Sequence, residues 1–146
     1  EAEGTDQLSP AGYSGTPLAR KLGIKADMTC AAIDAPPEYE ALLDGLPDGV
    51  RFDTDALGSL DFVHVFVDKA AGLGRRLTAL RRNITPNGMI WVSWPKKASG
   101  VKTDVTGNVV RDAGLGAGLV DIKVCAVDET WSGLKFVIPR AQRPRR

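Results

Sequence analysis

The chain has 146 residues, 43% of them hydrophobic and 25% charged, which is ordinary for one folded domain with its own core. No apolar run approaches the roughly 20 residues of a membrane helix, and no basic start followed by an apolar stretch resembles a secretory signal. We therefore expect a cytoplasmic protein without a membrane partner.

The net charge of +1 conceals an asymmetry along the chain. Carboxylates outnumber bases up to Asp61, and bases are in excess from Phe62 onward. Such a split can mark a surface for an anionic partner, although charge runs are more often simply solvated. Because the acidic half would repel DNA and no base-reading motif is present, nucleic acid is an unlikely partner.

The residues that bind metals or form disulfides are few. Cys30 and Cys125 lie in apolar, strand-like runs and are expected to be buried and reduced, as in a cytosol. His64 is the only histidine. We therefore expect neither a metal site nor a cofactor.

The first half of the chain predicts short alternating elements. Residues 1–12 are polar and aperiodic, which predicts a flexible arm before a single domain at 13–139. Thr16-Pro17 is typical of a helix start, and Gly23 of a helix end. The elements expected after it are a strand at Met28–Ile33, a helix at Pro37–Leu43 and a short strand at Val50–Phe52.

The middle of the chain carries the strongest signals. Leu60–Val67 is β-branched and aromatic and apolar on both faces, which predicts a strand covered on both sides. Ala70–Asn83 is predicted to be a helix with Leu73, Leu77 and Leu80 on one stripe. In LRRNITPNGMIWVSWPKK, this helix ends in a Pro-Asn-Gly turn, and a buried strand at Met89–Trp94 stops at Pro95.

The last third of the chain predicts a helix and a hairpin. Thr106–Ala113 is predicted to be helical, with Gly114 near its end. Strands at Leu119–Val127 and Leu134–Ile138 flank the polar turn DETWSG and must be antiparallel neighbours. The basic tail at 140–146 is rich in proline and arginine and is expected to be disordered.

This order predicts an α/β fold of the Rossmann-like type. Strands that alternate with helices indicate a mostly parallel sheet, here of about six strands with helices on both faces. The closing hairpin adds an antiparallel strand at the C-terminal side.

Two resemblances follow from these segments. LDFVHVFVDK, RNITPNGMIWVSWPK and LVDIKVCAVDETWSGLKFVIP are similar to the fourth to seventh strands of class I S-adenosylmethionine methyltransferases. YSGTPLARKLGIK, ITPNGMIWVSWPKKASGVKTDVT and VCAVDETWSGLKFV resemble, over nearly the whole chain, the bacterial family called domain of unknown function 3052 (DUF3052). The second resemblance implies the same fold and no established activity.

The residues after the first strand argue against the methyltransferase cofactor. A nucleotide cofactor needs a glycine turn there, so that backbone amides can approach it. The chain has Asp34-Ala35-Pro36-Pro37 instead, and proline has no N–H to donate. Asp53 follows the second strand, where related enzymes often hold the ribose with an acid. We also expect one strand-helix unit to be missing between Asp55 and Leu60.

Candidate ligand-binding residues cluster at predicted strand ends. In open α/β sheets, ligands lie beyond the carboxyl ends of the strands. Beside Asp53, the candidates at these ends are Asp34, Asp68, Trp94, Lys96, Lys97 and Lys102. Two carboxylates beside ammonium groups can serve acid–base chemistry or bind a polar ligand. Equally, such residues occur wherever buried strands meet solvent.

The remaining polar and aromatic residues have less specific interpretations. His64 is expected to be a hydrogen-bonded core residue rather than a catalytic base, and Trp91 to belong to the core. Trp131 is placed in the closing turn, where it would cover the cleft or join an interface between copies. The loop after Pro95 is not a P-loop, and no nucleophile elbow is present.

Three functions remain open. The preferred one is a non-catalytic domain that binds an anionic small molecule or a protein partner at the strand ends. The first alternative is a degenerate methyltransferase-like transferase that uses Asp34, Asp68 and Lys96. The second is a nucleic-acid-associated protein that uses the basic C-terminal half. A homodimer is compatible with each.

Overall fold

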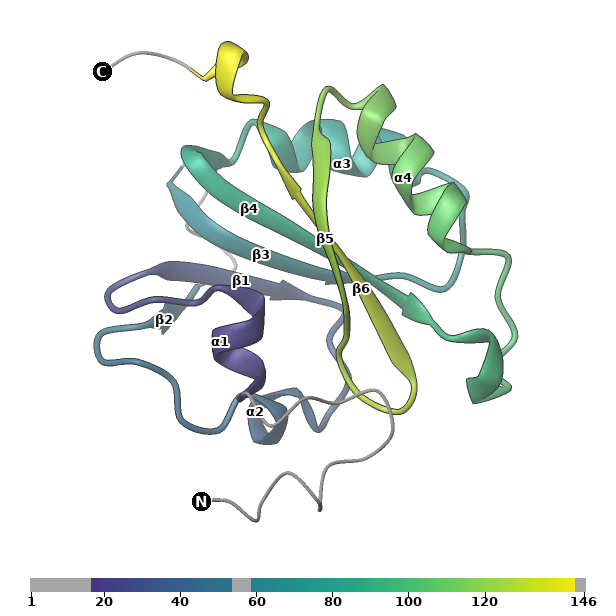
Figure 1. Cartoon of the computed structure of the whole chain (residues 1–146), viewed down its shortest axis with the longest axis horizontal. Helices are drawn as coiled ribbons and strands as arrows, with labels where there is room; N and C mark the ends of the chain where they lie inside the picture. Colours follow the sequence, from purple (N-terminus) through teal and green to yellow (C-terminus); the bar gives the residue numbers. More distant parts are fainter. Residues whose placement is uncertain (1–16, 54–58, 144–146) are drawn as a thin grey trace.

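The computed structural model describes residues 17–53 and 59–143, and its centre is one six-stranded sheet. The strand order is β2-β1-β3-β4-β6-β5, and the first four strands run parallel (Figure 1). Strand β6 is antiparallel to β4 and to β5. The predicted mostly parallel sheet with a closing hairpin is therefore confirmed. The strands are β1 (Thr29–Ile33), β2 (Arg51–Phe52), β3 (Leu60–Phe66), β4 (Ile84–Pro95), β5 (Val120–Ala126) and β6 (Trp131–Val137).

Helices cover both faces of this sheet (Figure 1). The short helices α1 (Leu18–Leu22) and α2 (Tyr39–Leu42) pack on one face, and the longer α3 (Leu73–Arg81) and α4 (Gly107–Gly116) on the other. Two single 3-10 turns, η2 (Lys97–Ser99) and η3 (Arg140–Gln142), follow β4 and β6. Within the described ranges no helix is long and apolar enough to cross a membrane.

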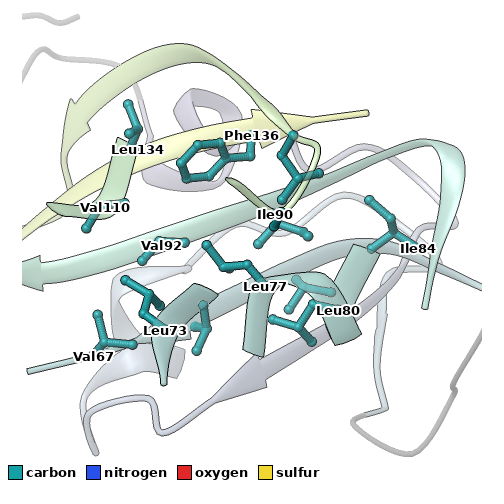
Figure 2. Close-up of a cluster of buried hydrophobic side chains, with 14 of the residues drawn as sticks. Val67, Leu73, Leu77, Leu80, Ile84, Ile90, Val92, Val110, Leu134 and Phe136 are labelled. Atoms are coloured by element: carbon teal, nitrogen blue, oxygen red, sulfur yellow. The ribbon is translucent and has the colours of Figure 1, made fainter. Parts of the chain in front are cut away.

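The larger core lies between the sheet and the pair α3 and α4. Figure 2 shows the predicted leucine stripe of α3 facing Ile90 and Val92 of β4. Helix α4 approaches β6 closely because Gly114 has no side chain, and a Cβ at this position would overlap the ring of Phe136. The sequence placed Gly114 near the helix end, but the helix continues to Gly116.

The second core, beneath α1 and α2, is aromatic. Trp91 is fully buried there, as predicted, and its indole N–H donates to the carbonyl of Leu22 at 2.8 Å. Gly23 ends α1 in the left-handed conformation that glycine favours. The predicted N-cap Thr16 and the whole predicted arm at 1–12 lie outside the described residues. So does most of the region after Asp55 where a missing unit was expected.

The predicted Pro-Asn-Gly turn is wrong. These residues lie within β4, which begins at Ile84. Between Leu60 and Phe62 of β3, the partner on β4 jumps from Ile84 to Met89, so the intervening residues form a bulge. Glycine is required at position 88, because a Cβ there would lie 3.0 Å from the carbonyl oxygen of Leu60.

The position predicted for Trp131 is also wrong. The hairpin turn is shorter than DETWSG because the carboxylate of Asp128 accepts the N–H groups of Thr130 and Trp131, both at 2.8 Å. Strand β6 therefore starts at Trp131. Its half-buried ring meets the edge of Phe66, with ring centroids 5.0 Å apart.

The two cysteines and the C-terminal tail differ in part from their predictions. Cys30 is buried, whereas Cys125 is only half-buried, and both are free thiols. The segment expected to be a disordered tail begins with the turn η3, and Arg143 behind it donates to the carbonyl of Ile138 at 2.9 Å. Residues 144–146 are outside the described part of the chain.

Candidate functional site

The carboxyl ends of β1 and β3 lie side by side, because Ile33 pairs with Val65 in parallel register. Asp34 and Asp68 follow these two strands, as the sequence predicted. Asp34 has a left-handed backbone with φ of 57°, and its carboxylate forms an ion pair with Arg76 of α3 at 2.8 Å. Both side chains of this pair are exposed, so it contributes little stability.

The loop after β4 is held in place by its own hydrogen bonds. The N–H of Lys96 donates to the carbonyl of Thr130 at 2.7 Å, which joins the start of the loop to the hairpin. At its far end, the hydroxyl of Thr103 donates to the carbonyl of Asp68 at 2.6 Å, and Asp104 accepts the N–H of Ala70 at 2.8 Å. The loop is therefore fixed against the segment that follows β3.

Three lysines project from this anchored loop. Lys97 and Lys102 are exposed and Lys96 is half-buried. In the described part of the chain, no carboxylate lies within ion-pair distance of their ammonium groups. The loop thus presents uncompensated positive charge beside the carboxyl ends of β3 and β4.

Of the other two candidates, Trp94 lies at the end of β4 just before the lysine loop, and Asp53 lies away from it. Trp94 packs against the core beneath α3 and α4, and its ring lies 3.5 Å from the place of a Cβ on Gly107. Asp53 follows the edge strand β2, and its N–H donates to the carbonyl of Cys30 at 2.7 Å. Through the parallel register, Asp53 lies level with Ile90 of β4. Lys96 is three strand spacings (about 14 Å) across the sheet and six residues (about 20 Å) along β4 from that level, so the two residues lie far apart.

The turn after β1 does not fit S-adenosylmethionine. Its prolines, Pro36 and Pro37, supply no N–H groups. The carbonyl of Pro36 instead accepts the N–H of Tyr39 at 3.0 Å, which closes the turn on itself. In place of a glycine turn with free backbone N–H groups, the chain therefore has a closed turn and the carboxylate of Asp34, which is paired to Arg76.

A pocket of about 520 Å³ opens between α2 and the edge of the sheet. Its walls include Ala32, Tyr39, Leu43, Leu46 and Phe52, and its rim the acids Glu40 and Asp44. None of the seven candidate residues is in this lining. Sequence reasoning missed the pocket because it is formed by a loop and three elements, β1, α2 and β2, that carry no recognisable motif.

A chain of buried polar groups lies on the same face of the sheet. Nδ1 of His64 is 2.9 Å from the hydroxyl of Tyr39, and Nε2 is 2.7 Å from the hydroxyl of Ser93. The prediction of a hydrogen-bonded core histidine is confirmed. Ser93 is fully buried, so it cannot attack a ligand. The three hydrogen-bonded side chains instead connect α2, β3 and β4 through buried polar contacts.

Burial sets the protonation states of these groups. It lowers the pKa of His64 to about 3, because no described carboxylate compensates the charged imidazole. Burial, and after it the charge of Asp61, raises the pKa of the Cys30 thiol to about 12. The pKa of Tyr39 is raised as well, chiefly by burial. None of these groups is poised as an acid, base or nucleophile near neutral pH.

The sheet order, the helices on both faces and the closing hairpin define a Rossmann-like fold of the methyltransferase type. No protein-family model and no curated protein matches the chain. The resemblance to DUF3052 therefore stays a prediction.

Solved structures show the likeness of fold directly. A possible exported protein from Bordetella parapertussis is similar with a TM-score of 0.61 and 10% identity over 84% of this chain, which spans 66% of that protein. A chain in the complex of the Haloferax volcanii Trm112 methyltransferase activator with a putative methyltransferase is similar with a TM-score of 0.60 and 13% identity. The match covers 88% of this chain and 87% of that one. An S-adenosylmethionine-dependent methyltransferase from Aquifex aeolicus is similar with a TM-score of 0.54 and 14% identity, and the match covers 83% of this chain and 88% of that one.

Proposed function

We propose that this protein is a non-catalytic, methyltransferase-like domain that binds an anionic small molecule at the carboxyl ends of its parallel strands. The observation that carries the proposal is the anchored loop after β4 with its three uncompensated lysines, Lys96, Lys97 and Lys102. An anion bound there would need little loop ordering, which lowers the entropic cost of binding.

The closed turn after β1 supports a binding role rather than methyl transfer. The N–H groups that would approach a nucleotide cofactor are absent at Pro36 and Pro37. No described histidine or cysteine near the lysine loop has a pKa suited to acid–base catalysis. Asp34, Asp68 and Trp94 remain proposed contacts of this ligand, whereas Asp53 lies too far from the loop and belongs to the second candidate below.

A thermal-shift screen of phosphorylated and carboxylated metabolites tests the proposal. A ligand at a hundredfold its Kd should stabilise the protein by about 2.7 kcal/mol. Hits should lose their shift in the double variant Lys96→Gln with Lys97→Gln and retain it in Arg75→Gln with Arg82→Gln, which changes the net charge equally at exposed positions away from the loop. A panel without hits, or the shift of a monophosphate or carboxylate hit that survives in the loop variant, contradicts the proposal.

The fold itself favours a second candidate, a degenerate methyltransferase-like transferase. All three structural neighbours named above share the fold, and one of them is named as an S-adenosylmethionine-dependent methyltransferase. Asp53 after β2 is the residue in favour of ribose binding. Calorimetric titration with S-adenosylhomocysteine decides between the candidates. A heat of binding that disappears in Asp53→Asn supports the transferase, and the absence of any heat of binding excludes it.

A protein partner or homodimer would use the edge strand β5. Ile122 and Val124 are 55% and 63% exposed there, and one structural neighbour comes from a complex with an activator protein. The bulge between Asp121 and Lys123 opposes simple strand pairing. Light scattering of the eluted protein measures its mass, and a monomer at high concentration excludes the homodimer.

A further inference from the structure

A group of lysines meets on the face of the β5–β6 hairpin that α1 covers. Lys123 of β5 pairs directly with Lys135 of β6 in antiparallel register. The ammonium of Lys135 lies 3.4 Å from the place of a Cβ on Gly23, the residue that ends α1. Lys25 follows two residues later and is close enough for its charge to act on Lys135. We call Lys25, Lys123 and Lys135 the hairpin lysine cluster.

This arrangement costs stability in the free protein. Like charges directly opposite each other on neighbouring strands repel. Burial, and after it the charges of Lys123 and Lys25, lowers the pKa of Lys135. Across residues 17–53 and 59–143, no carboxylate forms an ion pair with any member of the cluster.

The surroundings offset this repulsion only in part. The ammonium of Lys123 donates to the carbonyl of Lys21 at 3.0 Å, near the C-terminal end of α1, where carbonyl groups favour cations. Lys135 has no comparable acceptor among the described residues and is half-buried beside α1. Its strand partner on the other side is the buried Trp91.

The cluster is separate from the loop after β4. Lys135 is paired with Trp91, which lies five positions before Lys96 on β4. At the usual rise per residue, the two groups of lysines are about 17 Å apart. A small anion bound at one group cannot contact the other.

From this geometry we infer that the hairpin lysine cluster is a second anion-binding site, for an oligophosphate group. The three ammonium groups, from the residues after α1 and from β5 and β6, are close enough for the charges of Lys123 and Lys25 to act on Lys135. Lysine binds phosphate as a point charge without the planar geometry that arginine imposes. A multiply charged phosphate chain contacts all three at once, whereas a single carboxylate compensates only one. Binding also removes the cross-strand repulsion.

Tripolyphosphate, added at constant ionic strength with sodium chloride, is the probe. It should raise the unfolding midpoint by about 5–10 °C at a hundredfold its Kd. Inorganic phosphate, with fewer charges, should give a smaller shift. In the double variant Lys123→Gln with Lys135→Gln, at least half of the tripolyphosphate shift should disappear. The control, Arg75→Gln with Arg82→Gln, changes the net charge equally at exposed positions outside both lysine groups and should keep the shift.

Amide chemical-shift mapping on the unmodified protein gives an independent test that needs no variant. The expected perturbations centre on Lys25, Lys123 and Lys135. Perturbations confined to residues 96–102, or a full midpoint shift in the cluster variant, overturn the second site and leave the proposed loop site intact. Absence of any response to tripolyphosphate also overturns it.

Discussion

His64 offers a sharp test of the buried polar chain, because it is the only histidine in the sequence. In the folded protein its pKa lies near 3, whereas the ordinary value is 6.5. The imidazole therefore stays neutral in the folded state while the unfolded chain takes up a proton below pH 6.5. Stability present above pH 6.5 is lost as the pH falls toward 3.

The size of this loss follows from the two pKa values. Between pH 7.5 and 5.0, protonation of the unfolded chain lowers the free energy of unfolding by about 2 kcal/mol. For a chain of this length, that corresponds to a decrease in the unfolding midpoint of about 4–8 °C. The result depends little on the folded pKa as long as it stays below about 4.

Urea unfolding, followed by tryptophan fluorescence at several pH values, measures this loss. The variant His64→Gln keeps hydrogen-bonding capacity toward Tyr39 and Ser93 but cannot titrate, so its stability should be nearly flat over the same interval. A flat profile in the natural protein, or an unchanged slope in the variant, would refute the assignment of His64 as a neutral buried residue.

The remaining predictions concern the larger core. Gly114→Ala should destabilise the protein by about 1–3 kcal/mol, since its Cβ overlaps the ring of Phe136, whereas Gly116→Ala in the same helix has open space and should be neutral or stabilise by up to about 0.5 kcal/mol. Leu77→Ala should cost about 2–5 kcal/mol because Leu77 is fully buried, and Leu115→Ala, at a half-exposed position, less than about 0.5 kcal/mol. Chemical denaturation measures all four, and equal losses within either pair would contradict the packing described for α4 and α3.

Much of the sheet could be predicted because its signals are local. Leu60–Phe66 is apolar on both faces, as a central strand between two helical layers must be. The closing hairpin follows from two apolar runs separated by a turn too short for any other pairing. The same local reasoning failed at Pro86-Asn87-Gly88, where turn-forming residues lie in a bulge that the neighbouring strand β3 stabilises.

The candidate site was only partly predictable. The positions of Asp34 and Asp68 follow from the rule that ligands lie at carboxyl strand ends. The ion pair of Asp34 with Arg76 does not, because 42 residues separate them in sequence. The hairpin lysine cluster was invisible for the same reason, since its members come from three separate segments: the residues after α1, strand β5 and strand β6.

The sequence by itself determined the order and type of the elements, the parallel sheet and the turn without glycine after the first strand. These are properties of the pattern of side chains within a few consecutive residues. Only the tertiary structure decided which charges face each other, which polar groups are buried and where pockets open. Those depend on strand order and register, which bring distant residues together through packing that no local pattern encodes.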